Sequence, residues 1–403
     1  MYFASQEFYN FIESQRGEDP LKLRLSKSSE NFDREFAIIQ IECRKKCKQK
    51  LAFFTSESRF LFPDSVSARQ ASHQAIARFH SALLDSERTI LDMTAGLGID
   101  AMTFATIPHR EVTAIELDKK KAEILCHNAE VLNLKNLKVI NGDSIEFLNS
   151  NQKNYDLIFI DPSRIDSNHN RVYNLKDCGP DVIKFQDLIL SHARRVFIKA
   201  SPMLDISQTI KDFHNLRSLR AVGVKGECKE VLIELASPTE LTFSSEEIIL
   251  EAIDLDGDGN IISCFSCASN IPIHKIEYAS SDDLKPGNFL LEPSAMMMKI
   301  SPWSRICEDF KAKKIGRSSH LFISEEKPEG FQGRVSRLVN VISKKDRKNL
   351  FGLPASIVSR NHPLSADEIR KSYKLKEGDN NFIYATRLND KPILVLSETI
   401  THR

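Results

Sequence analysis

Between residues 89 and 236 the chain alternates short apolar runs with longer amphipathic segments. The runs are "TILDM", "VTAIEL", "LKVI", "YDLIFI", "RVFIKA", "LRAVGV" and "EVLIEL". Each has the length of a buried strand, and segments between them such as "DKKKAEILCHNAEVLNL" have the apolar spacing of helices. This alternation predicts βαβ units and a largely parallel sheet that is covered on both faces.

The α/β pattern occupies only part of the chain. At 403 residues the chain is too long for one ordinary domain. Its first part has mostly helical patterning, notably in "DSVSARQASHQAIARFHSALL", and its last part reads as short strands and helices. We therefore expect a helical region over 1–85, the α/β domain over 86–240, a β-hairpin and α+β segment over 241–328, and a last α+β unit over 329–403.

Composition excludes several classes of protein. The chain is 41% hydrophobic and 28% charged, as soluble globular proteins are. No run reaches the eighteen apolar residues that a membrane span needs. The beginning, "MYFASQEFYNFIESQRGEDP", lacks the basic region followed by an apolar one that marks a secretion signal. We expect a cytoplasmic protein with no membrane partner.

Two features resemble metal sites. Cys43 and Cys47 are one helical turn apart and Cys264 and Cys267 form a CxxC, but neither pair has the glycine-rich knuckles or the His pair of a zinc site. The letters "DLDGDGN" match the start of a calcium-binding loop, yet Phe265 stands where that loop needs a bidentate Glu. We expect no metal, and a hairpin turn at the Asp-Gly letters.

Charge is distributed unevenly. Over residues 299–376 there are 18 Lys and Arg against 8 Asp and Glu, a net charge of +10. Because the whole chain has a net charge of +1, the rest carries −9. A basic region on a mildly acidic body suits a polyanionic partner, and a solvated Lys-rich surface is the alternative.

The segment "ILDMTAGLGIDA" predicts a ligand site at the end of the first strand. That strand ends at Asp92, Gly96 and Gly98 flank a tight turn, and a helix follows. Glycines are needed where the backbone turns sharply and lies close to a ligand. Glu116 ends the next strand, where its carboxylate can accept hydrogen bonds from both hydroxyls of a ribose.

Two cofactors fit this arrangement. The segment satisfies a G-x-G-x-x-A nicotinamide fingerprint, with an acid eighteen residues after its second glycine. Asp92, four residues before the first glycine, and "NGDS" at 141–144 favour S-adenosylmethionine instead. In that interpretation Asp143 faces the adenine amino group and Asp92 helps to hold the methionine end.

Four motifs follow one another at four successive strand ends: "DMTAGLGID", "AIELD", "NGDS" and "DPSR". Over residues 85–240 the chain resembles the class I S-adenosylmethionine-dependent methyltransferases. The resemblance implies a Rossmann-like seven-stranded sheet. It also implies these cofactor-binding residues: Asp92, Thr94, Gly96, Gly98, Glu116, Asp143, Ser144 and Asp161.

Further segments extend the resemblance along nearly the whole chain, among them "QASHQAIARFHSAL", "FLLEPSAMMMKI", "GRVSRLV" and "SRNHPLSADEIRKSYKLKEGDNNFIYATR". They are similar to a bacterial family of methyltransferases with a ferredoxin-like segment and a C-terminal THUMP-like domain. The resemblance implies that 241–328 holds the ferredoxin-like segment and that 329–403 is THUMP-like. Since THUMP domains are associated with RNA-modifying enzymes, it also implies RNA, either tRNA or rRNA, as the partner.

The fourth motif, "FIDPSR", is where the acceptor is expected, with Asp161 and Arg164 as catalytic residues. Enzymes that methylate exocyclic amines of bases usually place two prolines and an aromatic after the acid, so that the acid and a backbone carbonyl accept the amine hydrogens and the aromatic stacks on the base. Here Ser163 and Arg164 replace the second proline and the aromatic. Arg164 can stack or hold a phosphate, or it forms an ion pair with Asp166 or Asp177.

Other substrate-binding residues are expected nearby. The loop at 165–180 follows the fourth motif and is expected to face the substrate. It holds Arg171 and also Tyr173, which either stacks on a base or packs the loop onto the domain. Lys199, at the end of the fifth strand, either reaches the active site or extends its ammonium group into solvent. Gln70 and Ser72 precede the first motif and are expected near the cofactor.

The motifs leave several reactions open. "DPSR" also resembles the "DPPR" of uracil-5 methyltransferases, but these need a cysteine after the next motif strand, where this chain has "KASP". We therefore expect S-adenosylmethionine-dependent transfer of a methyl group to a nitrogen of RNA. The alternatives are a protein or small-molecule acceptor, and a non-catalytic RNA-binding protein with the same fold.

Overall fold

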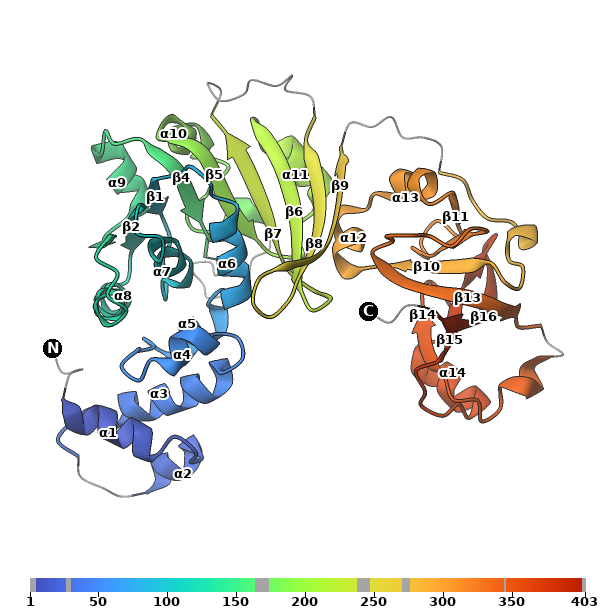
Figure 1. Ribbon diagram of the computed structural model, residues 1–403, viewed down its shortest axis with the longest axis horizontal. Coiled ribbons are helices and arrows are strands. Elements are labelled where there is room, and N and C mark those ends of the chain that lie inside the picture. The colour runs from blue at the N-terminus through green and yellow to red at the C-terminus, as the bar shows by residue number, and fades with distance from the viewer. Residues whose placement is uncertain are drawn as a thin grey trace. The chain divides into compact units, whose positions relative to one another are not determined.

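The computed structural model describes residues 5–26, 30–163, 174–237, 247–269, 276–343 and 346–400. The chain divides into two compact units, which are treated separately below (Figure 1). The first unit comprises residues 1–225, 229–245 and 255–262. The second comprises residues 226–228, 246–254 and 263–403.

The first unit begins with the predicted helical region, shown in blue in Figure 1. Its helices are α1 (Gln6–Ser14), α2 (Pro20–Leu25), α3 (Arg34–Cys47), α4 (Ala52–Ser56), α5 (Ser65–Gln70) and α6 (Gln74–Ala82). Asp33 and Asp64 each precede a helix and accept a hydrogen bond from a backbone N–H of its first turn. Phe8, Phe36 and Ile41 form the core between the first helices, so this region has apolar packing of its own.

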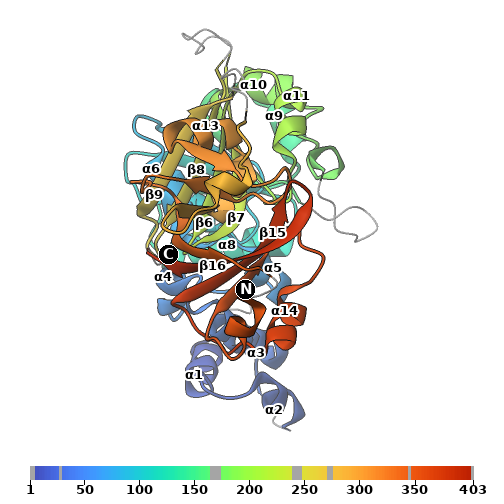
Figure 2. The same ribbon diagram turned by 90° about the vertical axis from the view of Figure 1, so that its right-hand side faces the viewer.

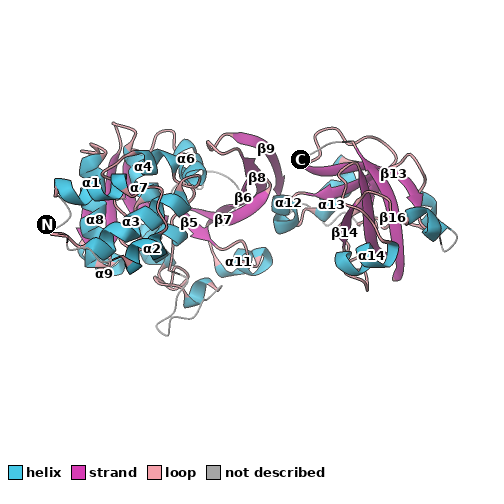
Figure 3. Cartoon of the chain, turned by 90° about the horizontal axis from the view of Figure 1, so that it is seen from below, coloured by secondary structure: helices cyan, strands magenta, loops and turns pink. Residues whose placement is uncertain are grey.

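The first unit also holds the predicted sheet (Figure 3). Its strands are β1 (Thr89–Asp92), β2 (Glu111–Glu116), β3 (Leu137–Asn141), β4 (Tyr155–Ile160), β5 (Ala193–Ala200), β6 (Leu216–Val224) and β7 (Glu227–Ala236). They lie in the order β3-β2-β1-β4-β5-β7-β6. The pairs among the first five strands are parallel, and β7 is antiparallel to β5. The predicted Rossmann-like order of these seven strands is therefore confirmed, and the sheet to which they belong has nine strands in all.

Helices connect the strands of this sheet. They are α7 (Ile99–Ala105), α8 (Lys119–Val131), α9 (Ser144–Ser150), α10 (Gln186–Ser191) and α11 (Ile206–Asp212), with a 3₁₀ turn, η2, at Leu175–Asp177. Helices α7, α8 and α9 begin within a few residues of the ends of β1, β2 and β3. The loops at one edge of the sheet therefore come from consecutive strand ends, which is where open α/β sheets bind ligands.

The Asp-Gly letters form the predicted hairpin turn. Strands β8 (Ile249–Leu255) and β9 (Ile261–Ala268) are neighbours in a sheet. The Asp256 carboxylate accepts hydrogen bonds from the backbone N–H groups of Asp258 and Asn260, at 2.8 and 2.9 Å. Gly259 has a φ of +95°, a conformation that favours glycine.

The second unit contains a seven-stranded sheet of its own. Its elements are η3 (Ser281–Asp283), β10 (Phe289–Pro293), α12 (Ala295–Ile300), α13 (Trp303–Asp309), β11 (Ala312–Lys314), β12 (Phe322–Ser324), β13 (Gly333–Val341), η4 (Asp346–Leu350), β14 (Ser356–Ser359), α14 (Ala366–Tyr373), β15 (Asn381–Leu388) and β16 (Lys391–Thr399). The strand order is β11-β12-β10-β13-β16-β15-β14. Figure 2 shows α14 beside these strands.

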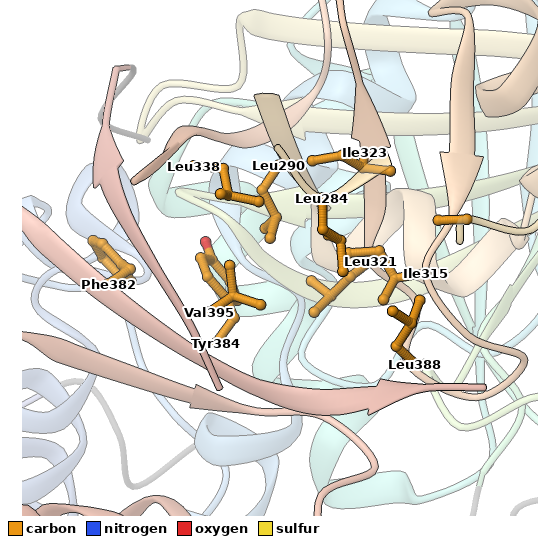
Figure 4. Packing of buried hydrophobic residues seen from close by; sticks show 11 residues of the cluster. Leu284, Leu290, Ile315, Leu321, Ile323, Leu338, Phe382, Tyr384, Leu388 and Val395 are labelled. Atoms are coloured by element: carbon orange, nitrogen blue, oxygen red, sulfur yellow. The ribbon is translucent and has the colours of Figure 1, made fainter. Parts of the chain in front are cut away.

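Both faces of this second sheet are covered by apolar side chains. On one face Leu290, Leu338, Tyr384 and Val395 point toward one another (Figure 4). On the other face a separate cluster packs around Ile369 of α14. The sheet is therefore the centre of one α+β unit, and its strands come both from the expected segment 241–328 and from the expected segment 329–403. In the part of the chain that the structure describes, every helix falls short of the length and apolarity of a membrane span.

Arg44 of α3 holds the N-terminal region together from inside. Its side chain is buried, and its guanidinium donates four hydrogen bonds of 2.6–3.1 Å. The acceptors are the backbone carbonyl oxygens of Thr55, Glu57, Ser58 and Phe60. Burial lowers the pKa of this arginine, but the four acceptors replace the water that its charged form loses.

We therefore expect Arg44→Met to destabilise the protein by about 2–4 kcal/mol, because it leaves these carbonyls without their donor. Lys45→Met is the matched control: its exposed neighbour on the same helix should change stability by no more than about 0.5 kcal/mol. Chemical denaturation followed by circular dichroism measures both. Equal stability of the two variants would contradict this role of Arg44.

Candidate active site

The loops at the carboxyl edge of the first sheet enclose a cavity of about 640 Å³. A volume of this size lies in the range of cofactor and ligand sites. The cavity is lined from the ends of β1, β2, β3 and β4 and from the segment that joins α5 to α6. All eight predicted cofactor-binding residues line it: Asp92, Thr94, Gly96, Gly98, Glu116, Asp143, Ser144 and Asp161. Gln70 and Ser72 line it as well.

The two glycines of the first motif shape the floor of this cavity. Gly96 and Gly98 have φ values of +57° and +82°, so both adopt the left-handed conformation that glycine tolerates best. A Cβ on Gly98 would lie 2.1 Å from a methyl carbon of Leu125, so that side chain would have to shift to admit it. A Cβ on Gly96 would meet nothing within 4 Å. Both glycines therefore have the backbone conformation of the predicted tight turn. Only at Gly98 does packing against a neighbouring side chain also favour glycine.

Backbone amides fix the carboxylate of Glu116. Its Oε2 accepts a hydrogen bond of 2.8 Å from the N–H of Gly96, and its Oε1 accepts one of 2.8 Å from the N–H of Asp118. The end of β2 is thereby tied to the glycine turn after β1. A carboxylate has further lone pairs beyond these two bonds, so Glu116 can still accept hydrogen bonds from a ligand.

Asp143 is fixed in a similar way after β3. Its Oδ1 accepts hydrogen bonds from the backbone N–H groups of Ile145 and Glu146, at 2.8 and 2.9 Å, and so caps the start of α9. Its neighbour Ser144 is buried. The Asp of the "NGDS" motif therefore caps a helix and also lines the cavity.

Asp92 is the most deeply buried carboxyl group of the predicted set, with 2% of its surface exposed. Its Oδ1 accepts a hydrogen bond of 3.0 Å from the N–H of Thr94. Burial raises the pKa of Asp92 well above its usual range, and the nearby charges of Asp100 and Asp161 raise it further. A cation bound beside Asp92 would relieve this cost.

Asp161 lies where the fourth strand meets the cavity. Its backbone N–H donates a hydrogen bond of 2.7 Å to the hydroxyl of Thr94, which joins the ends of β1 and β4. Its carboxylate Oδ2 accepts a hydrogen bond of 2.5 Å from the ammonium group of Lys199. The side chain of Asp161 is 29% exposed and that of Lys199 is 10% exposed. The alternative in which Lys199 extends into solvent is therefore wrong. Lys199 contacts Asp161 from below the surface of the cavity and does not itself line it.

A buried row of polar side chains continues from Lys199 into the core. The ammonium group also donates to the Ser72 hydroxyl at 2.9 Å, and that hydroxyl is bonded to Asp100. Asp100 and Glu230 then bind the two ring nitrogens of His80, at 2.9 and 2.6 Å. Sequence reasoning missed Asp100, His80 and Glu230, because His80 and Glu230 are 150 positions apart and no motif relates them.

Three predicted substrate-binding residues, Arg164, Arg171 and Tyr173, lie outside the described residues. The two ends of their loop are nevertheless placed. The backbone N–H of Ser163 donates to Gly179 at 2.8 Å, and that of Gly179 donates back at 3.1 Å. The loop therefore begins and ends beside the cavity.

Negative charge dominates the lining of the cavity. Among the described residues that line it, six carry a carboxylate and one, Lys121, carries an ammonium group. The six are Asp92, Asp100, Glu116, Asp118, Asp143 and Asp161. Within the described ranges no three potential metal ligands come together. The cavity suits a ligand with positive charge and several hydroxyl or amino groups.

Known families match three parts of the chain. Residues 87–202 match the family described as RNA cap guanine-N2 methyltransferase. Residues 289–331 match a ferredoxin-like domain, and residues 334–399 match a THUMP domain-like family. The three matches lie in the order expected from the sequence.

Solved structures are also similar. A crystal structure from Porphyromonas gingivalis W83, of a protein with a methyltransferase assignment, is 25% identical, with 98% of each chain covered and a TM-score of 0.82. TrmN from Thermus thermophilus is 18% identical over 40% of this chain and 48% of its own, with a TM-score of 0.31. M. capricolum TrmK in complex with S-adenosyl-homocysteine is 14% identical over 42% of this chain and 69% of its own, also with a TM-score of 0.31.

No curated protein matches the sequence. The similarity to the P. gingivalis structure covers both units, and the family matches fall in both as well. The chain is therefore a methyltransferase with a ferredoxin-like domain and a C-terminal THUMP-like domain.

Proposed function

We propose that this methyltransferase uses S-adenosylmethionine and transfers its methyl group to a nitrogen of tRNA or rRNA. The observation that carries the choice of cofactor is the acidic lining of the cavity. S-adenosylmethionine brings a positively charged sulfonium and an ammonium group. A nicotinamide dinucleotide brings a negatively charged pyrophosphate, which the acidic side chains that line the cavity disfavour.

Each cofactor residue has a role that agrees with its place in the cavity. Glu116 accepts hydrogen bonds from the ribose hydroxyls with the lone pairs that the backbone leaves free. Asp143 accepts one from the adenine amino group. Asp92 and Thr94 hold the methionine end, where an ammonium group would sit beside the buried carboxyl group.

Asp161 faces the acceptor. When bound, S-adenosylmethionine supplies a methyl group that is transferred by in-line displacement, so the protein mainly has to orient the nucleophile. Lys199 occupies Oδ2 of Asp161, so Oδ1 would accept a hydrogen bond from an exocyclic amine. As the N–C bond forms and the S–C bond breaks, the proton that the amine loses would pass to this carboxylate and then to solvent. Arg164 is the second proposed catalytic residue, and Arg171 and Tyr173 are proposed to contact the substrate. All three roles are proposed from the sequence.

RNA is the acceptor that the rest of the chain favours. A polyanion suits the basic region at 299–376. This region overlaps the ferredoxin-like and THUMP domain-like matches. A nitrogen acceptor agrees with the family matched at 87–202, whose description names guanine N2. With RNA as substrate, we place the enzyme in the cytoplasm. We also retain the predicted domain boundaries after residues 85, 240 and 328.

Asp92 supplies a test of the cofactor. Because its pKa is raised in the free protein, ionising Asp92 costs stability at pH above that pKa, and a bound cation favours the ionised form. Binding of S-adenosylmethionine should therefore release protons and strengthen as pH rises through the raised pKa. Asp92→Asn should raise the melting temperature of the free protein at pH 8 and weaken binding by about tenfold or more.

Calorimetry in two buffers of different ionisation enthalpy measures both the affinity and the protons released. NAD, titrated under the same conditions, should give no binding. Tight binding of NAD without binding of S-adenosylmethionine would overturn the proposed cofactor. An unchanged affinity in Asp92→Asn would remove that residue from the methionine end.

Asp161 supplies a test of the reaction. RNA from a strain that lacks this gene, incubated with the enzyme and labelled S-adenosylmethionine, should gain a methyl group on a base nitrogen. Mass spectrometry of the nucleosides identifies the RNA and the atom. Asp161→Ala should lower the rate of transfer by about 100-fold or more and change cofactor affinity by less than about tenfold.

Asp187→Ala is the matched control, because Asp187 is an exposed carboxylate that pairs with His214 away from the cavity. It should leave the rate unchanged. If the label enters a protein fraction and not RNA, the acceptor is a protein. A fully active Asp161→Ala variant would show that Asp161 is not catalytic.

A further inference from the structure

A row of charged side chains runs from the cavity into the interior of the first unit. Its members are Asp161, Lys199, Ser72, Asp100, His80 and Glu230. Asp161 follows β4, Lys199 lies in β5 and Ser72 precedes α6. Asp100 lies in α7, His80 in α6 and Glu230 in β7. Apart from Asp161, every member has at most 9% of its surface exposed.

The chemistry of the donors fixes the direction of each hydrogen bond in the row. An ammonium group can only donate, so Lys199 donates to Asp161 and to the Ser72 hydroxyl. The Ser72 hydroxyl then donates to Asp100, since a carboxylate can only accept. Both ring nitrogens of His80 lie within hydrogen-bond distance of carboxyl oxygens, and ionised carboxylates only accept, so with Asp100 and Glu230 ionised each nitrogen donates a proton. His80 is therefore an imidazolium ion.

The charges along the row alternate in sign. Burial lowers the pKa of His80, but the charges of Glu230 and Asp100 outweigh it and bring the pKa to about 9. Burial also lowers the pKa of Lys199, and the carboxylates of Asp161, Asp100 and Glu230 reverse that effect, so that the net shift is upward. Both groups are charged at neutral pH. Three carboxylates against two cations leave the row with one negative charge.

Stability alone is a poor explanation for this arrangement. Taking several ions out of water costs free energy that ion pairs barely return, and apolar residues of similar volume often stabilise a fold as well or better. Five of the six members are buried. Asp161, Ser72 and Asp100 line the cavity, and of these three only Asp161 is not buried. The arrangement therefore serves the position of the Asp161 carboxylate.

We propose that Lys199 and Ser72 are positioning residues for methyl transfer, which hold Asp161 in one orientation through the buried row. This rests on the proposed role of Asp161 as the group that accepts from the acceptor amine. Lys199 ties down Oδ2, and among the described residues no side chain is bonded to Oδ1, which we assign to the amine. The Ser72 hydroxyl accepts a second hydrogen bond from the ammonium group and so fixes its position. The carboxylates behind Lys199 offset its charge, so that a sulfonium in the cavity is not repelled.

Ser72→Ala tests the row without touching Asp161. It removes the link between Lys199 and Asp100, and we expect kcat to fall by about tenfold with the affinities for S-adenosylmethionine and RNA changed by less than about threefold. Ser72→Thr retains the hydroxyl and should recover most of the rate. Lys199→Met should lose about 100-fold in kcat, and Lys199→Arg, which keeps a charged donor, should recover part of it.

Ser218→Ala is the matched control. Ser218 is a buried serine of β6 whose hydroxyl donates to the Glu234 carboxylate at 3.0 Å, and it does not line the cavity. Its loss should cost as much stability as that of Ser72, with no change in kcat. If Ser72→Ala and Ser218→Ala have the same kcat, the row does not position Asp161 and the proposal is overturned.

A second measurement does not depend on transfer. NMR of protein labelled with ¹⁵N histidine should show both ring nitrogens of His80 protonated at pH 7.5. A neutral His80 ring would mean that the alternating row does not exist, and this outcome also overturns the proposal. The wild-type enzyme could also methylate no RNA while His80 is an imidazolium ion. That result would contradict RNA as the acceptor and would support the alternating charges of the row.

Discussion

The register between the parallel strands of the first sheet is the constraint on which the site depends. Asp92 is paired with Phe159, and Ile160 is paired with Ile198. The next positions are Asp161, directly after β4, and Lys199, within β5, which places the two side by side. A shift of one residue in this register would turn every side chain of a strand to the other face. The ion pair would then be lost together with the packing of the core.

This constraint explains which parts could be predicted from the sequence. The strand ends, the glycine turn and the acids that follow each strand obey local rules, because the conformation and the sheet edge follow from neighbouring residues. Asp92, Glu116 and Asp143 could therefore be named in advance. The partner of Lys199 could not, since it depends on the register between two strands. His80 and Glu230 were further out of reach, because tertiary packing joins them across 150 positions.

Charge is divided between two tasks along the chain. The described lining of the cavity holds six carboxylates and one ammonium group, while residues 299–376 carry a net charge of +10. Such a cavity attracts a cationic cofactor and disfavours RNA phosphates. An RNA substrate must therefore be bound by its backbone elsewhere and present only an uncharged base to Asp161. Basic side chains far along the sequence from the cavity fit that requirement.

The proposed cofactor half and the proposed acceptor half of the cavity are also held by different means. On the cofactor half, Glu116 and Asp143 are fixed by backbone N–H groups, which every residue other than proline provides. On the acceptor half, Asp161 is fixed by the side chain of Lys199 and, behind it, by Ser72. A single substitution can therefore alter the acceptor half while the cofactor half keeps its geometry. This difference matches the sequence. The cofactor motifs follow the pattern common to class I methyltransferases, whereas the acceptor motif has Ser163 and Arg164 where enzymes that methylate base amines usually have a second proline and an aromatic residue.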